Sequence, residues 1–302
     1  MALFEGFDSL TVTGADGGPV HVRRGGEGPP LLLLHGFPQT HAMWHAVAPL
    51  LATEFTVVAT DLRGYGESRR HVRTGDAPPP YDKRALAGDL VRVMDALGFG
   101  RFAVAGHDRG ARCAYRLALD HPARVTRLAV LDIVPTADAL DAVDARGARQ
   151  LWRWFLMAQP HPVAERLIAG DPETFLFGAH AGLFAPEALA AYRKAADDPA
   201  VVHAMCEDYR AMFGPDLEHD REDRRAGRRI EAPVLALWGG RSHTERHHDV
   251  LAVWRRWAGD VRGRALDCGH FLPEEAPAET YAELRSFFAE TETEAEAAAG
   301  AG

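Results

Sequence analysis

An apolar run passes into a helical pattern in the stretch Phe102-Ala-Val-Ala-Gly-His-Asp-Arg-Gly-Ala-Arg-Cys-Ala-Tyr115. Its centre, Gly106-His-Asp-Arg-Gly110, has the form Gly-x-Asp-x-Gly, which is a nucleophile elbow with aspartate in place of the usual serine. Glycines are needed there because the turn is tight and its backbone packs closely against its neighbours. The turn lifts the carboxylate of Asp108 above a sheet, beside a helix N-terminus that favours negative charge. The alternative is a glycine-bounded turn in which Asp108 only caps the helix.

The rest of the chain alternates between strand-like and helix-like patterns. Continuous apolar runs, typical of strands covered on both faces, occur at residues 30–34, 55–60, 102–105 and 128–131. Helical patterns lie between them at residues 45–52, 83–97 and 110–121, and β-rich segments at 10–13 and 20–23 predict an antiparallel start. This alternation predicts a mostly parallel, doubly wound sheet of the α/β class.

The alternation is interrupted after Pro135. Residues 136–228 carry helical patterns without a convincing strand, and strand–helix alternation resumes at 233–238, with later segments at 250–257, 263–266 and 279–288. We therefore expect a core of residues 1–135 and 229–290. A helical cap of residues 136–228 should lie over the carboxyl edge of the sheet, where open α/β sheets bind ligands. Residues 291–302, rich in Glu, Ala and Gly, predict a disordered tail.

Composition narrows the class of function. The chain has 302 residues, of which 47% are hydrophobic, and a formal net charge of −9 without a long Lys/Arg block, which argues against nucleic-acid binding. Its three cysteines lack disulfide or metal-ligand spacing, the first residues lack the apolar core of a signal peptide, and no apolar stretch reaches the length of a membrane span. We expect a cytoplasmic protein with no metal, no cofactor and no membrane partner. A homodimer is allowed but not required.

Two further residues follow predicted strands in the chain order of an α/β-hydrolase triad, which is nucleophile, acid and histidine. Asp132 ends the apolar run at 128–131, and His270 follows the last predicted strand in Asp267-Cys-Gly-His-Phe271. A histidine in that place, with both partners in order, is expected to act as a base held by Asp132. The alternative is that Asp132 only caps the end of its strand.

A turn after the strand at 30–34 supplies an oxyanion hole. His35-Gly-Phe-Pro38 sits where this fold provides one backbone N–H group, here from Phe37. The other N–H group comes from Arg109, the residue after the nucleophile. The alternative is a simple Gly-Pro turn.

Several segments resemble those of the fluoroacetate (haloacetate) dehalogenases, over nearly the whole chain apart from the tail. They are His35-Gly-Phe-Pro-Gln-Thr-His-Ala-Met-Trp44, Gly106-His-Asp-Arg-Gly-Ala-Arg112, Leu131-Asp-Ile133, Cys206-Glu-Asp-Tyr-Arg210 and Gly269-His-Phe-Leu-Pro-Glu-Glu275. The resemblance implies that Asp108 attacks the halogen-bearing carbon of an anionic small molecule. It also implies that the side chains of Arg109 and Arg112 bind the substrate carboxylate; the alternative for Arg112 is an exposed helix residue.

An aspartate nucleophile suits that chemistry. Its adduct with an amide or ester would be an anhydride, whereas displacement at an sp³ carbon gives a stable ester. His270 would then activate a water that attacks the carbonyl carbon of Asp108. Arg109 and Arg112 lie three residues apart at the start of one helix, so both can reach the same side and offer bidentate binding.

The resemblance also implies a halide pocket in the cap, where the sequence departs from the family. The family's His-Trp pair corresponds to Arg153-Trp154, which are the expected halide-binding residues, and its halide-binding Tyr corresponds to Gly214. The stretch 175–184 is shorter than usual and has no Trp. Arg153 can replace the His as a charged donor, turn to solvent, or pair with a cap carboxylate, and Trp154 can simply pack in the cap. Because fluoride depends most on hydrogen bonds as it leaves, we expect chloroacetate or bromoacetate to be preferred over fluoroacetate.

Three other functions are weighed against this one. An epoxide hydrolase of the same fold needs cap tyrosines, of which the chain offers Tyr192 and Tyr209, and leaves the two arginines without a task. A haloalkane dehalogenase is expected to carry Trp after the nucleophile, where Arg109 stands. A non-catalytic binding protein of this fold usually lacks a triad member, and none is missing here.

Overall fold

The computed structural model describes residues 3–69 and 80–290, so the predicted tail at 291–302 lies outside the described residues. An eight-stranded sheet forms the centre, with the order β1-β2-β4-β3-β5-β6-β7-β8. Its strands are β1 (Asp8–Thr13), β2 (Pro19–Gly25), β3 (Pro30–Leu34), β4 (Thr56–Thr60), β5 (Phe102–His107), β6 (Val125–Leu131), β7 (Val234–Gly239) and β8 (Val261–Leu266). β1 and β2 pair antiparallel at one edge and the other six strands run parallel to one another. The predicted α/β class, with a mostly parallel sheet and an antiparallel start, is confirmed.

The central strands are buried on both faces, as their continuous apolar sequences predict. Every residue of β4, β5 and β7 is buried. Because neighbouring strands are parallel, their carboxyl ends meet at one edge of the sheet. At that edge β5, β6 and β8 lead into Asp108, Asp132 and His270, respectively.

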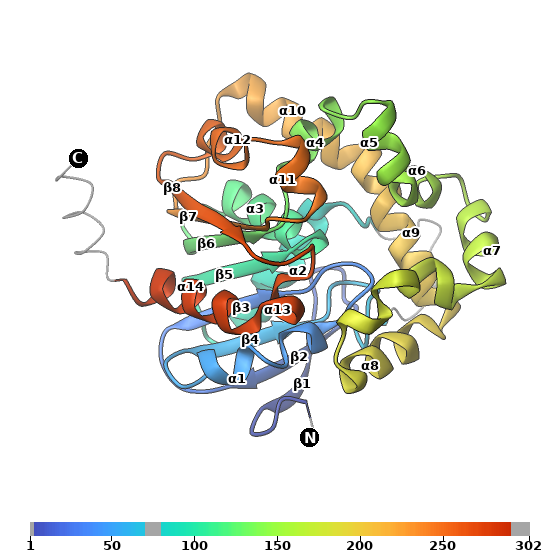
Figure 1. Ribbon diagram of the computed structural model, residues 1–302. Coiled ribbons are helices and arrows are strands. Elements are labelled where there is room, and N and C mark those ends of the chain that lie inside the picture. Colours follow the sequence, from blue (N-terminus) through green and yellow to red (C-terminus); the bar gives the residue numbers. More distant parts are fainter. Residues whose placement is uncertain (1–2, 70–79, 291–302) are drawn as a thin grey trace.

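Helices cover both faces of the sheet (Figure 1). One face carries α2 (Lys83–Ala96), α3 (Arg109–Asp120) and α12 (Val250–Trp257), and the ring of Tyr115 in α3 packs 5.8 Å from that of Trp254 in α12. The other carries α1 (Ala48–Leu51) and α14 (Pro277–Ala289), where Phe288 packs 6.5 Å from Phe55. Three short helices join these elements: η1 (His41–Trp44), α11 (His243–His247) and α13 (Leu272–Glu275). Within the described ranges, no helix combines the length and apolarity that a membrane crossing requires.

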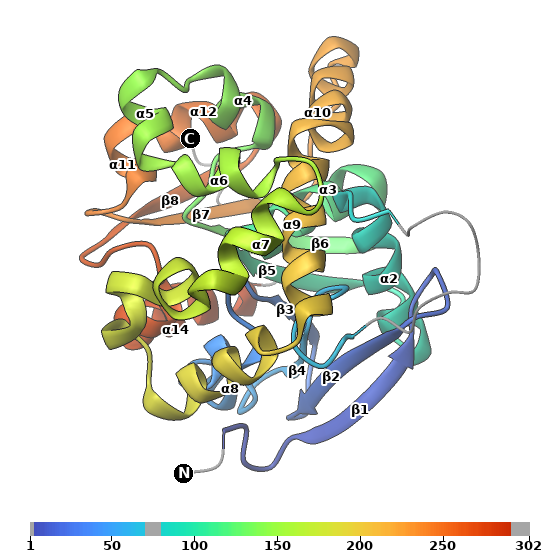
Figure 2. The ribbon, with the colours of Figure 1, turned by 90° about the vertical axis from the view of Figure 1, so that its right-hand side faces the viewer.

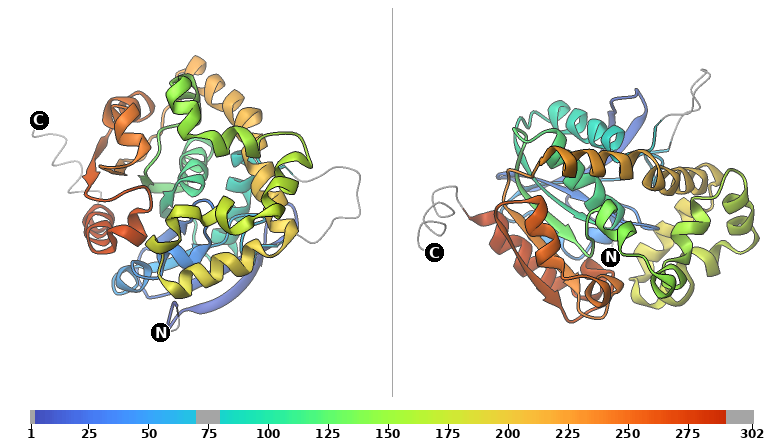
Figure 3. Two further views of the ribbon diagram at one scale, coloured as in Figure 1. Left: turned by 45° about the vertical axis from the view of Figure 1, so that its right-hand side comes forward. Right: turned by 90° about the horizontal axis from the view of Figure 1, so that it is seen from above.

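Every regular element between β6 and β7 is a helix, which is the inserted helical cap of the predicted fold class. These elements are α4 (Thr136–Asp141), α5 (Ala145–Gln150), α6 (Trp152–Met157), α7 (Val163–Gly170), η2 (Glu173–Phe177), η3 (Gly178–Leu183), α8 (Pro186–Ala196), α9 (Pro199–Phe213) and α10 (Pro215–Ala226). Figure 1 shows α6, α7 and α8 as a lobe to one side of the sheet, and in Figure 2 this lobe lies in front of the strands. α9 and α10 form a long bent band that runs from the lobe back along the core (Figure 3).

Buried ion pairs bind α9 and α10 to the core. Arg109, the first residue of α3, donates from Nε and Nη2 to the carboxylate of Asp208 in α9 at 2.8 and 2.6 Å. Two turns along α3, Arg116 binds Asp220 and Asp223 of α10 at 3.0 and 2.6 Å. All of these side chains are almost completely buried. The pairs therefore fix the two cap helices relative to the helix that follows the nucleophile.

Asp208→Asn should weaken this connection and destabilise the fold. The carboxylate also binds Lys83, so the substitution leaves Arg109 without its carboxylate partner and leaves Lys83 with only Asp216, at 3.5 Å. Burial opposes ionisation of Asp208, but the charges of Arg109 and Lys83 outweigh it and lower the pKa of Asp208. Removing one partner of a buried pair costs about 3–5 kcal/mol, which urea unfolding can measure.

The matched control is Glu218→Gln, which removes one negative charge from an exposed position of α10. It should change the free energy of unfolding by less than about 0.5 kcal/mol. Similar losses in Asp208→Asn and Glu218→Gln would mean that net charge, and not the buried pair, determines the effect.

Candidate active site

Asp108 occupies the turn between β5 and α3 in a backbone conformation that side-chain-bearing residues rarely adopt, with φ = 45° and ψ = −112°. The glycines on either side make this turn possible. A Cβ on Gly106 would lie 2.5 Å from the carbonyl oxygen of Gly110, and a Cβ on Gly110 would lie 2.4 Å from that of His35. The backbone therefore packs too closely for any larger residue, and the Asp108 side chain is held out beyond the strand ends.

One carboxylate oxygen of Asp108 is held by the turn after β3. The backbone N–H of Phe37 donates to Oδ2 at 3.0 Å. Among the described residues no hydrogen bond to Oδ1 is present, so that oxygen remains for a reaction. Burial opposes ionisation of Asp108, but nearby positive charge, that of His270 first, and the Phe37 N–H outweigh it and lower the pKa of Asp108. The group is therefore a carboxylate near neutral pH.

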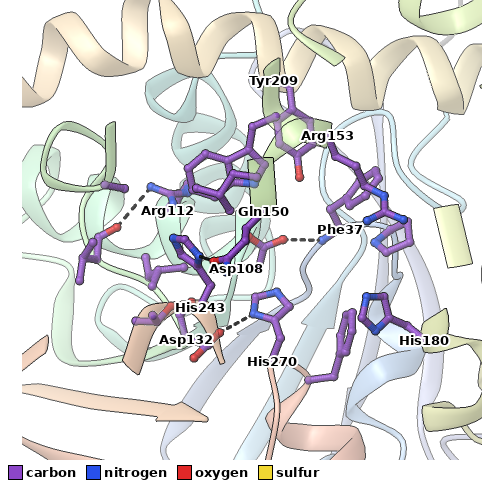
Figure 4. Close-up of a pocket in the computed structure, with 18 of the residues that line it drawn as sticks. Phe37, Asp108, Arg112, Asp132, Gln150, Arg153, His180, Tyr209, His243 and His270 are labelled. Carbon is purple, nitrogen blue, oxygen red and sulfur yellow. Dashed lines mark hydrogen bonds and ion pairs between the residues drawn. The ribbon is translucent and has the colours of Figure 1, made fainter. Parts of the chain in front are cut away.

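Asp132 and His270 form the second half of the site. Nδ1 of His270 lies 2.5 Å from Oδ2 of Asp132, whose Oδ1 accepts the backbone N–H of Gly239 at 3.0 Å. With Nδ1 engaged, Nε2 is the ring nitrogen left for the cavity, and Figure 4 shows the ring beside Asp132 and below Asp108. Burial lowers the pKa of His270, but the bond to Asp132 and the charges of Asp132 and Asp108 outweigh it and raise that pKa.

Two residues outside the predicted site, His107 and Glu275, hold the backbone around His270. His107 donates from Nε2 to the carbonyl oxygen of His270 at 2.7 Å. Glu275 accepts the backbone N–H groups on either side, those of Gly269 at 2.8 Å and Phe271 at 2.9 Å. Burial and the charge of His270 lower the pKa of His107 to about 4, so it stays neutral as the donor. Both residues stand inside the motifs quoted above, but only the fold shows that they meet.

A cavity of ≈ 230 Å³ opens above Asp108, between the sheet edge and the cap (Figure 4). The predicted residues Asp108, Asp132, His270 and Phe37 line it. Further charged, titratable or aromatic side chains complete the wall: Arg112, Arg153, Trp154, His180, Tyr209, His243, His248 and Phe271.

Arg112 lines this cavity without a counter-ion. Its Nη1 donates to the hydroxyl of Thr136 at 2.9 Å and to the carbonyl oxygen of Val134 at 3.3 Å, and its guanidinium lies 5.2 Å from the ring centroid of Trp154. Its Nε is buried and has no hydrogen-bond partner. Within the described part of the chain Arg112 forms no ion pair, in contrast to Arg109. Because Arg112 lines the cavity and no described carboxylate neutralises it, its guanidinium can bind an anion there.

The side chain of Arg109, which was predicted to bind the substrate carboxylate, is not among those that line the cavity. That role stays a prediction. The Arg109 guanidinium binds both carboxylate oxygens and the backbone oxygen of Asp208, contacts Sδ of Met212 at 3.0 Å and lies 4.4 Å from the ring centroid of Tyr209. A desolvated guanidinium needs a buried carboxylate, and Asp208 supplies it. The predicted role of the Arg109 backbone N–H in the oxyanion hole stays a prediction.

Tyr209 brings a phenol into the cavity where Gly214 was expected to leave a gap. Its ring packs edge-on against Phe37 at 5.4 Å, and Figure 4 shows its hydroxyl directed towards Asp108. Gly214 follows the last residue of α9 and does not line the cavity, so the assignment of that position to Gly214 is corrected. Burial and the charge of Asp108 raise the pKa of Tyr209, which keeps the hydroxyl neutral and able to donate. Tyr209 lies within the Cys206–Arg210 segment, but no local pattern of the sequence indicates that its side chain faces the pocket.

Arg153 and Trp154, the predicted halide-binding pair, both line the cavity from α6. Arg153 donates from Nε to the carbonyl oxygen of Phe175 at 2.9 Å, and its guanidinium lies 4.8 Å from the ring centroid of Trp152. It forms no ion pair with any described residue, so the alternative of a cap carboxylate partner does not apply to this part of the chain. The role of the pair in halide binding stays a prediction.

Three groups of side chains in the described residues could offer ligands to a metal ion. They are His21, His41 and Asp61; His161, Glu165 and His203; and Asp82, Asp216 and His219. None of these residues lines the cavity above Asp108.

Several known proteins are similar to this chain over nearly its whole length. Residues 29–277 match the alpha/beta hydrolase fold family. A fluoroacetate dehalogenase of Burkholderia sp. is 44% identical over 95% of this chain and 96% of its own. A soluble epoxide hydrolase of Corynebacterium sp. (strain C12) is 33% identical over 89% of this chain and 93% of its own. A solved structure from Nostoc sp. PCC 7120, assigned to the alpha/beta hydrolases, has 48% identity and a TM-score of 0.89, and covers 95% of this chain and 100% of its own.

Asp132→Asn should lower the pKa of His270 relative to the wild type. The substitution removes the charge and the bond that raise this pKa, while the burial that lowers it remains. The imidazole would then lose its proton at a lower pH, which NMR titration of the His270 ring can measure. Asp267→Asn, at a 97% exposed side chain on the same loop, is the control and should leave the pKa nearly unchanged. An unchanged pKa in Asp132→Asn would contradict the assigned pairing.

Proposed function

The chain belongs to the α/β-hydrolase family, and from that premise we propose that it hydrolyses the carbon–halogen bond of small 2-haloacids, haloacetates above all. The products are hydroxy acids and halide. The observation that carries the proposal is Arg112, a cation in the cavity wall with a buried, unpartnered N–H and no ion pair among the described residues. A buried charge without a partner is costly, and the carboxylate of a haloacid would supply that partner. The fluoroacetate dehalogenase relative supports the same chemistry.

The first step is displacement by Asp108. A haloacid bound through its carboxylate to Arg112 lies close to the nucleophile, because both residues belong to the turn and first helical positions after β5. Oδ1 of Asp108 attacks the α-carbon, the carbon–halogen bond breaks, and the halide leaves with the bonding electron pair. Oδ2 stays bound to the N–H of Phe37. The result is an ester between Asp108 and the acid.

The second step is hydrolysis of that ester. Nε2 of His270 takes a proton from water, and the oxygen attacks the carbonyl carbon of Asp108. The negative charge develops on Oδ2, where the Phe37 N–H already donates. Asp132 holds the imidazolium that forms. Collapse of the adduct breaks the Cγ–Oδ1 bond, so the product leaves with Oδ1 and takes the proton from His270. Asp108 keeps the oxygen of the water and loses its remaining proton to solvent. Esterification removes the charge of Asp108, so one cause of the raised His270 pKa is absent when the base is needed.

The departing halide needs hydrogen-bond donors. We assign this task to the hydroxyl of Tyr209 and the indole N–H of Trp154, with Arg153 further along the same wall. The expected preference for chloroacetate or bromoacetate over fluoroacetate depended on two changes in the cap, the loss of a halide-binding tyrosine and the replacement of a histidine by Arg153. Tyr209 supplies a phenol in the cavity, so the first change no longer supports the preference. The second still does, because Nε of Arg153 is already bound to the carbonyl oxygen of Phe175. We keep the order but expect a smaller preference, which kcat/KM values for the three acids can test.

An epoxide hydrolase is the second candidate function, favoured by the 33% identical relative. It would use Asp108 and His270 in the same way and would take its proton from Tyr209. The other cap tyrosine, Tyr192, does not line the cavity, because its hydroxyl binds Glu274. A neutral epoxide also leaves Arg112 without a partner. If the protein only bound a ligand, Asp108, Asp132 and His270, which all line the cavity, would have no catalytic role.

Arg112→Gln should separate acids from neutral substrates. It should lower kcat/KM for chloroacetate by roughly 10- to 150-fold, the equivalent of losing one hydrogen bond to a charged group. Chloroacetamide has no carboxylate to lose, so its turnover should change much less. Chloride release measures both reactions. Arg149→Gln, at an exposed position outside the cavity wall, is the control and should change neither.

Equal losses on chloroacetate and chloroacetamide would assign Arg112 a structural role and remove the main support for an acid substrate. A neutral epoxide should be included in the same assay with the wild-type protein. Faster turnover of the epoxide than of any haloacid would favour the second candidate function instead.

A further inference from the structure

Arg153 is a second cation in the cavity wall that no described carboxylate neutralises. It projects from α6, where its Nε is fixed by the carbonyl oxygen of Phe175 and its guanidinium lies 4.8 Å from the ring centroid of Trp152. These contacts orient the group and leave the Nη donors without a hydrogen bond to any described residue. Partial burial lowers the pKa of Arg153, but an arginine remains charged near neutral pH.

Arg112 and Arg153 lie on opposite sides of Asp108. In Figure 4 Arg112 stands on one side of the nucleophile, and Arg153 stands on the other side, above His180. The two acids in the described cavity wall are Asp108 and Asp132. Asp132 is paired with His270, whereas Asp108 is bound by the Phe37 N–H through Oδ2 only and is the attacking carboxylate. Apart from the nucleophile itself, the described wall therefore presents two separate positive charges and no unpaired carboxylate.

The cavity is also larger than a haloacetate requires. Its volume is ≈ 230 Å³, whereas one water occupies about 30 Å³ of liquid. Chloroacetate has only five non-hydrogen atoms. When such a molecule is bound at Arg112 with its α-carbon at Asp108, space remains on the Arg153 side. That side carries His180, whose pKa is lowered by partial burial and by the charges of Arg153 and His270.

We propose that the cavity takes 2-halo dicarboxylic acids, with the first carboxylate on Arg112 and the second on Arg153. This inference rests on the proposed function and names its substrate class. The reaction is unchanged: Oδ1 of Asp108 displaces the halide at C2, and water then hydrolyses the ester, with His270 taking one proton. A 2-halosuccinate thus gives 2-hydroxysuccinate, halide and a proton, and Asp108 is regenerated. The second carboxylate supplies the partner that Arg153 lacks.

The test compares 2-chlorosuccinate with 2-chlorobutanoate, which has the same number of carbons but one carboxylate. At fixed ionic strength the wild-type protein should show a kcat/KM for 2-chlorosuccinate at least about tenfold higher, because one charge-assisted pair is worth on the order of a factor of ten. Arg153→Gln should bring the ratio of the two values close to one. Arg153→Lys keeps the charge and should keep part of the preference. Arg149→Gln, exposed on the neighbouring helix α5, should leave the ratio as in the wild type.

Binding without turnover gives an independent measurement. Succinate should inhibit chloroacetate turnover more strongly than butanoate does, and Arg153→Gln should abolish that difference. If the wild-type protein turns over chloroacetate but does not prefer 2-chlorosuccinate, or if Arg153→Gln leaves the ratio unchanged, the inference is wrong and the proposed function stands. If chloroacetate releases no chloride at all, the proposed function is wrong, and this inference falls with it.

Discussion

A single buried ion pair, Arg109 with Asp208, connects the nucleophile to the cap. Arg109 follows Asp108 directly, and Asp208 directly precedes Tyr209. The contact therefore sets the distance between the carboxylate that would attack and the phenol that faces it across the cavity. Because both partners are almost completely buried, neither can leave the other without a large loss of stability. The arrangement of the site depends on this pair although neither side chain lines the cavity.

The same contact explains how the arginines of α3 divide their tasks. Arg109 and Arg116 are neutralised by acids of α9 and α10, and they hold the cap in place. Arg112 lies between them on the helix, lines the cavity and forms no ion pair with any described residue, so its charge is left for the cavity. A chain with a formal net charge of −9 thus presents a locally positive cavity, and such a cleft can attract an anion against the overall charge.

The sequence predicts the elements whose signals are local. The buried strand at residues 30–34 and the helix at 250–257 have the predicted ends, because continuous apolar runs and helical periodicity are properties of a few neighbouring residues. The spatial meeting of Asp108, Asp132 and His270 was also predictable, since parallel strands bring their carboxyl ends to one edge. The buried surroundings of the Arg109 side chain were not. Its partner Asp208 is about one hundred residues away, and no local pattern indicates that the two meet.

The cap was predicted least well for the same reason. Which of its side chains face the cavity depends on how α6 and α9 pack against the core, and the shortened stretch at 175–184 gives no local signal of that packing. The sequence therefore placed Gly214 where the structure has Tyr209, and it named Arg153 and Trp154 without indicating that Trp154 packs against Arg112 whereas Arg153 is bound to the backbone of Phe175. The hydrogen bonds that His107 and Glu275 form with the backbone around His270 likewise have no local signal in the sequence.

The covalent ester on Asp108 is the central claim, and a single-turnover experiment with His270→Gln tests it most directly. This variant keeps the nucleophile and lacks the base, so chloroacetate should release about one chloride per protein and then stop. Peptide mass spectrometry should find one carboxymethyl group on Asp108, and the double variant Asp108→Asn/His270→Gln should carry none. Chloride release with an unmodified Asp108 peptide, or a carboxymethyl group on another side chain instead, would contradict the account.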